Sequence, residues 1–394
     1  MGHTICEKRE CTGCSVCVSS CPKKAIKIDL DECGFYRPKI EDNLCVNCNV
    51  CNRVCPVNNP PEVYGPTKAF AFQNTEEVRF NSTSGGFFHA IACRIIDDGG
   101  VVCGAAFEDD MVLRHIIVAK KEELAPLQRS KYVESSLDGI YTRIRDYLRN
   151  GRKVLFAGVG CQAAALRNYI GEDKNLIIID LVCYGVPSSG LFRDWITYIE
   201  KKYAKVVDVR FRDKSYGYYT PNIKVLFENG KYIENCRDSN IYAKLFFRNL
   251  SVRESCFSCH FKTVDRSSDI TLGDLWQTDG LETIKDDDKG TTCLFSHTEK
   301  GKELCQELGA VEIDKEMLLA KDAQKMVSCI STAAGTGKFW ELYKERGFEV
   351  IINTYEKDNF LRKVKYLIKS LLNRTGLSRW MYRKLKMKKI RDNR

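Results

Sequence analysis

Short apolar runs alternate with amphipathic segments over most of the chain. The apolar runs have the length of β-strands and lie at residues 69–73, 100–107, 154–157, 176–181, 206–211 and 223–227. Apolar residues at helical spacing predict helices over 87–97, 137–149 and 190–202. This alternation predicts a mixed α/β domain. A hairpin over 223–233, with its turn at Asn229-Gly230, indicates that the sheet is not purely parallel.

Different patterns precede and follow this region. Residues 25–40 contain β-like stretches around a turn signal at Gly34-Phe35. The proline-rich stretch 58–66 cannot continue a helix and predicts a linker. From Phe360 onward, apolar residues recur at helical spacing among lysines and arginines. The pattern therefore divides the chain into residues 1–60, 67–345 and 346–394.

The charge of the chain is concentrated at its end. The net charge is +10, but residues 361–394 contain 13 Lys or Arg against one acidic residue and carry +12, so residues 1–360 carry −2. Basic residues spread over the whole chain would suggest a nucleic-acid partner, and this distribution does not. The basic amphipathic tail leaves three readings open: a helix on an anionic membrane surface, a helix docked on the protein's own body, and a solvated polybasic end.

The N-terminal residues indicate a cytoplasmic protein. Residues 1–10 lack the apolar run of a secretory signal, and the most apolar stretch, 176–186, is short and interrupted by Asp180. We therefore expect no membrane-spanning segment. The tail leaves open a peripheral contact with the inner face of the membrane.

Ten of the 20 cysteines precede Pro56, and eight of these form a repeat. The same C-x2-C-x2-C-x3-C-P run occurs twice, displaced by 34 residues: Cys11, Cys14, Cys17 and Cys21, then Cys45, Cys48, Cys51 and Cys55. In two-cluster bacterial ferredoxins the fourth cysteine of each run binds the other 4Fe-4S cluster. This predicts one cluster on Cys11, Cys14, Cys17 and Cys55, and a second on Cys45, Cys48, Cys51 and Cys21. Structural zinc sites also use cysteines spaced by two, but they do not explain the third cysteine and the proline in both runs.

The remaining motifs lie in order along residues 67–345. They are Ser84-Gly85-Gly86 and the stretches 130–133 (SKYV), 155–162 (LFAGVGCQ), 180–188 (DLVCYGVPS), 256–259 (CFSC) and 269–276 (DITLGDLW). In this order they resemble the beta-subunit family of coenzyme F420-reducing hydrogenases and F420-dependent dehydrogenases. The resemblance implies bound FAD, a further 4Fe-4S cluster, and electron transfer between a hydride carrier and the clusters. Gly160 and Tyr184 stand where the family commonly has Pro and His, which leaves the substrate open.

Several residues are candidates for binding these cofactors. Ser84, Gly85 and Gly86 open a helix, where backbone N–H groups and glycines allow a phosphate or a flavin to approach, although an ordinary helix cap has the same sequence. Lys131 and Asp274 lie in the matching stretches and are further candidates for the cofactor site. Cys256 and Cys259 would suit a redox dithiol, half a zinc site or half a cluster. The sequence offers Cys161 and Cys183, each after a strand-like run, as the other two ligands of a third cluster.

The combined expectation is an iron–sulfur flavoprotein oxidoreductase. It consists of an α+β ferredoxin-like module, a mixed α/β flavin-binding domain and a basic helical tail. Its redox carrier, whether coenzyme F420, ferredoxin or a nicotinamide, stays open, as do a partner subunit and the catalytic residues. The alternatives are a ferredoxin-dependent reductase of an organic substrate, for example in an envelope polysaccharide pathway, and a non-enzymatic electron-transfer subunit.

Overall fold

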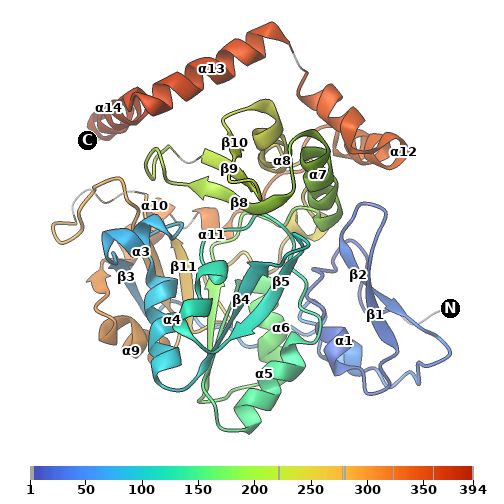
Figure 1. Cartoon of the computed structure of the whole chain (residues 1–394). Helices are drawn as coiled ribbons and strands as arrows, with labels where there is room; N and C mark the ends of the chain where they lie inside the picture. The colour runs from blue at the N-terminus through green and yellow to red at the C-terminus, as the bar shows by residue number, and fades with distance from the viewer. Residues whose placement is uncertain are drawn as a thin grey trace.

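The computed structural model describes residues 4–392 except 221, 277, 279, 280, 323 and 358. The last two residues of the predicted tail, Asn393 and Arg394, lie outside the described part. A small N-terminal module lies beside a central sheet with helices on its faces, a second small sheet lies above, and two C-terminal helices cross the top (Figure 1).

The N-terminal module repeats its backbone as it repeats its sequence. The helix α1 (Val16–Ser20) begins after Ser15 and α2 (Val50–Arg53) begins after Asn49, and both cap residues have left-handed φ angles of 62° and 58°. Between the helices, β1 (Ile26–Leu30) and β2 (Tyr36–Ile40) form an antiparallel hairpin. The predicted β-stretches around Gly34 are therefore confirmed.

The central sheet has eight strands in the order β13-β3-β12-β11-β7-β6-β4-β5. Its middle strands β4, β6, β7 and β11 are parallel, and β5, β12, β3 and β13 are antiparallel to their neighbours. The strands are β3 (Lys68–Phe72), β4 (Val101–Phe107), β5 (Leu113–Val118), β6 (Val154–Val159), β7 (Leu176–Leu181), β11 (Ile270–Asp274), β12 (Thr292–Ser296) and β13 (Val311–Ile313). The prediction of a mixed α/β domain is confirmed.

Helices cover both faces of this sheet. One core joins it to α4 (Phe87–Asp97) and α9 (Glu299–Glu307), and another joins it to α5 (Ile140–Arg149) and α6 (Gly160–Ile170). Parallel strands covered on both faces are apolar without alternation, and this explains why they stand out in the sequence as continuous runs. The module packs on the α5 and α6 side, where its Cys14 and Val16 enter the second of these cores.

A second sheet builds a core of its own. The antiparallel order is β10-β9-β8, as the predicted hairpin requires, and the core is rich in aromatic residues. Its strands and helices are β8 (Val206–Asp213), β9 (Asn222–Phe227), β10 (Tyr232–Glu234), α7 (Ser189–Lys202), α8 (Arg237–Phe247) and α12 (Thr336–Tyr355). The part predicted as one domain over 67–345 thus contains two cores.

The remaining helices are short or C-terminal. The short α-helices are α3 (Glu76–Phe80), α10 (Lys315–Asp322) and α11 (Gln324–Val327), and the 3-10 turns are η1 (Lys121–Glu123), η2 (Ala125–Leu127) and η3 (Glu254–Cys256). The tail forms α13 (Phe360–Arg374) and α14 (Leu377–Asp392), which confirms its predicted helical character. Within the described residues, no helix has the length and apolar composition needed to span a bilayer.

Candidate redox site

A cavity of about 300 Å³ lies where the parallel strands β6, β7 and β11 end. In open α/β sheets this edge is the usual place for a ligand, because the loops after the strands diverge there. The cavity is lined mainly by apolar side chains and by glycines, including Gly86, Gly104 and Gly158. We call it the first cavity. Ser84, Lys131 and Asp274 line it as well.

The Ser84–Gly86 turn is held by the sheet beside it. Ser84 Oγ donates to the carbonyl of Thr291 at 2.6 Å, and the N–H of Gly85 donates to Thr292 Oγ1 at 2.9 Å. A Cβ at Gly85 would lie 2.1 Å from the carbonyl oxygen of Phe72. Gly85 is therefore required by the close approach of strand β3, and its N–H already has a partner. Of the three predicted residues, Ser84 and Gly86 line the cavity and Gly85 supports the turn from behind.

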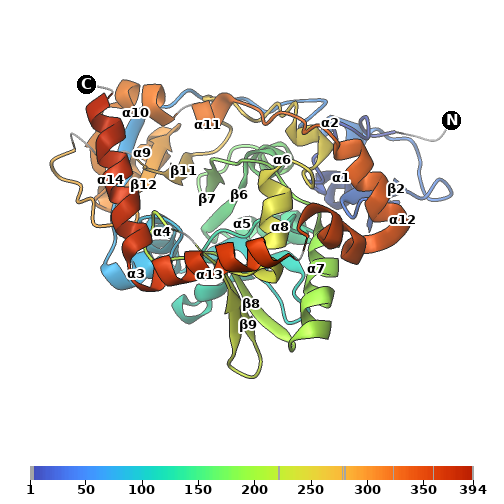
Figure 2. The same ribbon diagram turned by 90° about the horizontal axis from the view of Figure 1, so that it is seen from above.

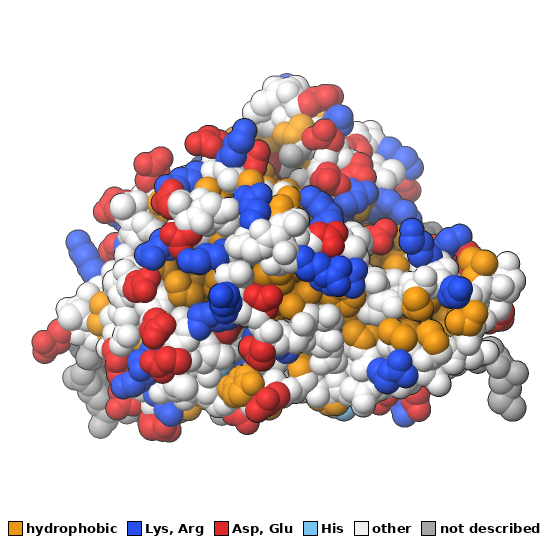
Figure 3. All heavy atoms as spheres, turned by 90° about the horizontal axis from the view of Figure 1, so that it is seen from below, with side chains coloured by type: hydrophobic (Ala, Val, Ile, Leu, Met, Phe, Trp, Pro, Cys, Tyr) orange, Lys and Arg blue, Asp and Glu red, His pale blue; other side chains and the backbone are white. Residues whose placement is uncertain are grey.

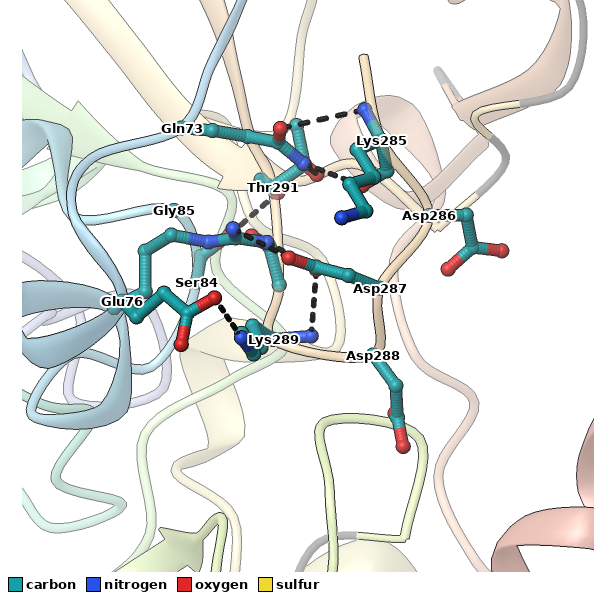
Figure 4. A network of polar contacts seen from close by, with 12 residues as sticks. Gln73, Glu76, Ser84, Gly85, Lys285, Asp286, Asp287, Asp288, Lys289 and Thr291 are labelled. Atoms are coloured by element: carbon teal, nitrogen blue, oxygen red, sulfur yellow. Dashed lines mark hydrogen bonds and ion pairs between the residues drawn. The ribbon is translucent and has the colours of Figure 1, made fainter.

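A polar network fixes the loop that runs beside this turn, residues 285–291 (Figure 4). Asp287 pairs with the buried guanidinium of Arg79 at 2.6 Å, and Gln73 Nε2 donates to the carbonyl of Lys285 at 2.7 Å and to Thr291 Oγ1 at 2.8 Å. Lys289 pairs with Glu76. These contacts tie the loop to α3 and to the end of β3, and they support the wall of the cavity that contains Ser84.

Lys131 supplies a positive group to the first cavity. Its Nζ donates to the carbonyls of Gln128 at 2.5 Å and Arg129 at 3.4 Å. Burial lowers the pKa of Lys131 to about 7, because an ammonium group is costly to desolvate. An anionic ligand beside Lys131 would favour the protonated form.

His115 of β5 is a cavity residue that the sequence did not reveal. Its ring is 4% exposed, stacks on Phe156 with centroids 5.4 Å apart, and places Nε2 3.1 Å from the carbonyl of Ala157. Burial lowers its pKa to about 4, so the ring is neutral at physiological pH. With Nε2 donating to Ala157, Nδ1 is an acceptor, and among the described residues it has no hydrogen-bond partner. No spacing pattern marks His115, and β5 itself was not predicted.

A second cavity, of about 1000 Å³, shares a wall with the first. Tyr132, Cys183 and Asp274 line both cavities. Five basic side chains line the second cavity: Arg212, Lys244, Arg248, Lys262 and Lys369. In the described lining, Asp274 is the one acidic residue. The second cavity is therefore suited to an anionic ligand.

Asp274 stands at the junction of the two cavities. Its carboxylate pairs with Arg212, whose guanidinium lies 5.3 Å from the ring centre of Tyr218 and 5.1 Å from that of Trp276. The Asp274 carboxylate also raises the pKa of Arg212, although burial acts in the opposite direction. Arg212 therefore stays charged and fixes Asp274 in the shared wall.

Four cysteines meet beside this wall. Cys161 lies in the first turn of α6, Cys183 follows β7, and Cys256 and Cys259 lie in and after η3. Burial and the neighbouring thiols raise the pKa of Cys183 to about 11 and that of Cys256 to about 12. The structure thus brings together the four residues that were predicted to bind a third cluster. Their role as ligands stays a prediction.

The structure brings the repeat's cysteines together in two groups within the module, and the crossed ligand sets stay a prediction. Cys21, Cys45, Cys48 and Cys51 line one small hollow of about 20 Å³. Cys14 and Cys17 interact electrostatically with Cys11 and Cys55. Among the described residues, no three His, Cys, Asp or Glu side chains are close enough to hold a single metal ion. Cys6, which lies outside the repeat, hydrogen-bonds Cys11 and Cys55, and the bond lowers the pKa of Cys55 to about 7.

The three cysteine groups follow one another from the cavities to the surface. Cys14 interacts electrostatically with Cys161, and the buried Tyr141 donates to the carbonyl of Cys14 at 2.8 Å. Within the module, Cys17 belongs to the group that contains Cys14, and it interacts electrostatically with Cys51 of the group that lines the small hollow. Cys48 of that second group is exposed.

Two regions of the chain match known families. Residues 151–319 match the C-terminal region of the family described as coenzyme F420 hydrogenase/dehydrogenase, beta subunit, and residues 10–59 match the 4Fe-4S dicluster domain. The chain is a beta-subunit-like protein with an N-terminal 4Fe-4S dicluster domain. The resemblance predicted from the motifs is confirmed.

Two curated proteins and one solved structure are similar to this chain. The F subunit of the F420H2 dehydrogenase from Methanosarcina mazei is 23% identical over 291 residues, which are 70% of this chain and 78% of the relative. An uncharacterised protein from Methanocaldococcus jannaschii is 22% identical over 205 residues, 44% of this chain and 56% of the relative. A chain of the F420-reducing [NiFe] hydrogenase complex from Methanosarcina barkeri is 17% identical with a TM-score of 0.45, covering 68% of this chain and 90% of that one.

Proposed function

We propose that this beta-subunit-like chain is a cytoplasmic flavin-dependent iron–sulfur oxidoreductase. In the proposal FAD binds in the first cavity, and Cys161, Cys183, Cys256 and Cys259 hold a third 4Fe-4S cluster. The observation that carries the proposal is the position of Cys183, which lines both cavities and belongs to the cysteine group nearest to them. A flavin, a cluster and a two-electron partner could then meet at one wall.

The residues of the first cavity fit a flavin. A flavin ring needs a largely apolar slot with a few fixed polar groups, and a pyrophosphate needs positive charge and N–H donors. His115 offers a buried acceptor without a hydrogen-bond partner among the described residues, Lys131 offers a cation, and Gly86 is the N-cap of α4. When bound, FAD would supply the exchange between two-electron and one-electron transfer, and the clusters would supply one-electron relay.

The protein's own residues orient the partners in this proposal. Asp274, fixed by Arg212, would hold a polar edge of the ligand in the shared wall. Lys244 is likewise paired with Glu356, so Arg248, Lys262 and Lys369 would supply the positive charge for an anionic partner in the second cavity. The phenol of Tyr184 donates to Asn249 Oδ1 at 2.6 Å, and burial raises its pKa. Tyr184 therefore stays protonated near neutral pH and would act as a hydrogen-bonding group, where a histidine would exchange protons.

Coenzyme F420 is the two-electron partner that we propose first, because the matched family and the Methanosarcina mazei relative carry it in their names. The second proposal is a ferredoxin-dependent reductase of an anionic organic substrate, as in an envelope polysaccharide pathway, and the basic second cavity favours it equally. In either case a partner subunit or ferredoxin would meet the module near the exposed Cys48, beside the exposed Leu44 and Val46.

The first test is the cofactor content of the full chain purified without oxygen. Three clusters and one flavin predict about twelve irons, an equal amount of sulfide and one FAD per chain. About eight irons and no flavin would contradict the proposal and leave the chain an electron-transfer subunit.

Single substitutions assign the third cluster. Cys183→Ser should lower iron by about four per chain and perturb the flavin absorption, whereas Cys48→Ser should lower iron by the same amount and leave the flavin unchanged. The matched control is Cys236→Ser. Cys236 is the N-cap of α8 and accepts from the N–H of Ser239, a role that serine fills well. Full iron content in Cys183→Ser would contradict the third cluster.

The electron carrier is identified by anaerobic reduction. Reduced F420, NADH and reduced ferredoxin are added separately, and the flavin and cluster absorption is followed. Fast bleaching by reduced F420 supports the first proposal. Bleaching by reduced ferredoxin alone supports the second, and no turnover with any acceptor supports an electron-transfer subunit.

A further inference from the structure

The helix α13 is attached to the body by one face only. Tyr366 donates to Glu356 Oε1 at 3.0 Å and accepts from Lys244 at 2.5 Å, and the buried Asn373 contacts Asn235 at 3.5 Å. Arg362 pairs with Glu356 at 3.2 Å. These contacts lie on the same side of the helix, because positions 362, 366 and 373 recur at helical spacing. They fix which side of α13 faces away from the protein.

The outer side of α13 is an apolar stripe. Its members share the opposite face of the helix and are Phe360, Leu361, Val364, Leu367, Ile368 and Leu371. Phe360 and Leu361 are 77% exposed, and Leu367, Ile368 and Leu371 are at least half exposed. Figures 1 and 2 show α13 and α14 along the upper side of the molecule with no other drawn element over them. A single exposed leucine is ordinary, but a continuous stripe on a helix marks an interaction surface.

The second C-terminal helix has the same construction. Arg379 pairs with Asp288 at 2.5 Å, and Tyr382 stacks on Tyr219 with centroids 5.1 Å apart, so this face of α14 lies on the body. The exposed apolar residues Leu377, Trp380 and Met381 lie on the other face, and the exposed Leu385 lies one turn from Tyr382. The stripe of α13 is thus continued beyond Gly376.

The charges around the stripe select its partner. Lys363 and Arg374 flank it on one edge and Lys365 on the other, and α13 contains no acidic residue. On the opposite side of the molecule, basic and acidic side chains are intermixed (Figure 3). An apolar stripe bordered by lysine and arginine, with a tryptophan close by, is the composition of a helix that lies in the interface of an anionic membrane. A second copy of this chain would instead place equal positive charges against one another.

We propose that the outer faces of α13 and α14 bind an anionic lipid bilayer surface. The apolar stripe would enter the boundary between headgroups and acyl chains, and the flanking basic residues would contact lipid phosphates. No membrane-spanning helix is needed for this. Lys369 of α13 lines the second cavity, so the helix that lies on the bilayer also forms part of that cavity's wall. Docking would hold the second cavity at the membrane surface.

The test is sedimentation of the full chain with vesicles, without oxygen. Vesicles of phosphatidylcholine alone are compared with vesicles of phosphatidylcholine and phosphatidylglycerol in equal parts. The wild-type chain should bind the anionic vesicles, with binding that weakens as salt is raised. The variant Leu367→Ser/Ile368→Ser/Leu371→Ser should bind about tenfold or more weakly, because its lost side chains are those that enter the lipid.

A matched control removes exposed apolar groups elsewhere. Val207 and Tyr232 are about as exposed as the stripe residues but lie in β8 and β10, so Val207→Ser/Tyr232→Ser should bind like the wild type. Equal iron and flavin contents show that each variant is folded. No binding of the wild type to anionic vesicles would overturn the proposal. A wild-type dimer in solution that the triple variant converts to a monomer would assign the stripe to a second copy and overturn it as well.

Discussion

One buried ion pair joins the N-terminal module to the rest of the protein, and breaking it provides a quantitative test of how the module is held. Arg253 and Glu134 are 0% and 3% exposed and form an ion pair. Arg253 also donates to the carbonyls of Cys11 at 3.1 Å and Tyr36 at 3.0 Å, and Glu134 accepts from the N–H of Tyr36 at 3.1 Å. The pair therefore belongs to the body but binds the module's backbone.

The variant Arg253→Met removes the cation beside the Glu134 carboxylate, which keeps only the N–H of Tyr36, and it removes one donor each from the carbonyls of Cys11 and Tyr36. Removing one partner of a buried ion pair costs about 3–5 kcal/mol. Burial already raises the pKa of Glu134 to about 7, against the opposing effect of Arg253. The carboxyl can therefore take up a proton in the variant, which places the cost near the lower bound at pH 7. A cost of about 3 kcal/mol would raise the population of the undocked module about 100-fold.

Hydrogen exchange measures this population. The N–H of Gly190 in α7 donates to the carbonyl of Gly34 in the module at 2.9 Å, so it is protected only while the module is docked. We expect Gly190 to exchange about 100-fold faster in Arg253→Met than in the wild type at the same pH. The control is Arg114→Met, which breaks an exposed pair with Asp110 and should change exchange by less than about tenfold.

The pH dependence provides a second criterion. The folded-state pKa of Glu134 lies above its unfolded value of 4.5, so the folded state binds the proton and loses stability as pH rises from 4.5 through the folded pKa. Removing Arg253 raises the folded pKa further and extends this loss to higher pH. The ratio of the Gly190 exchange rate in Arg253→Met to that in the wild type should thus grow above pH 7. In Arg253→Met/Glu134→Gln, which has no carboxylate at position 134, this ratio should not grow with pH. Exchange at Gly190 within about threefold of the wild type at all pH values would refute the role of the pair.

Three further outcomes follow from the cavity walls. In Gly85→Ala the new Cβ meets the backbone of β3, so we expect a loss of unfolding free energy of about 1–3 kcal/mol or more, measured by thermal unfolding with Cys236→Ser as the control. His115 has a folded pKa of about 4 against 6.5 when unfolded, so the free energy of unfolding should fall as pH is lowered from 6.5 to 4. The variant His115→Phe keeps the stacking on Phe156 and should flatten this pH dependence. An unchanged slope would contradict the burial of a neutral ring. Arg212→Met leaves the Asp274 carboxylate without its cation, and its negative charge then repels an anionic partner in the second cavity. The KM for that partner should rise about tenfold or more, with the flavin content unchanged. An unchanged KM would exclude Arg212 from the function of the second cavity.

The elements that the sequence predicted are those whose signal is local. The helix over 87–97 has the predicted bounds, and the buried parallel strands appear as apolar runs because both of their faces are covered. The edge strand β5 alternates between buried and partly buried residues, and β11, β12 and β13 were not predicted as strands. The pairing of β12 with β3 joins residues more than 200 positions apart, and no local pattern specifies it.

The candidate site divides in the same way. The repeat of Cys11 to Cys21 at Cys45 to Cys55 is visible in the sequence, and the left-handed caps at Ser15 and Asn49 show that the same local backbone geometry is built twice. His115 and Arg212 become cavity residues only through the packing of distant strands. The opposing strand β3 constrains Gly85, and no sequence pattern indicates this; a role for Gly85 at a cofactor stays a prediction.

The order of the three cysteine groups is a property of docking and not of any motif. Two of the groups lie within the module and the third lies within the body, and the step from Cys161 to Cys14 depends on how α1 packs against α5 and α6. Gly13 allows this approach, since a Cβ there would lie 2.4 Å from Glu134 Oε1 and 2.6 Å from the guanidinium of Arg253. The same ion pair that anchors the module thus sets the distance between the third cysteine group and the module's first. Under the proposed function, a substitution that loosens this ion pair should slow electron transfer between the cavities and the module, and the iron content of the chain should be unchanged.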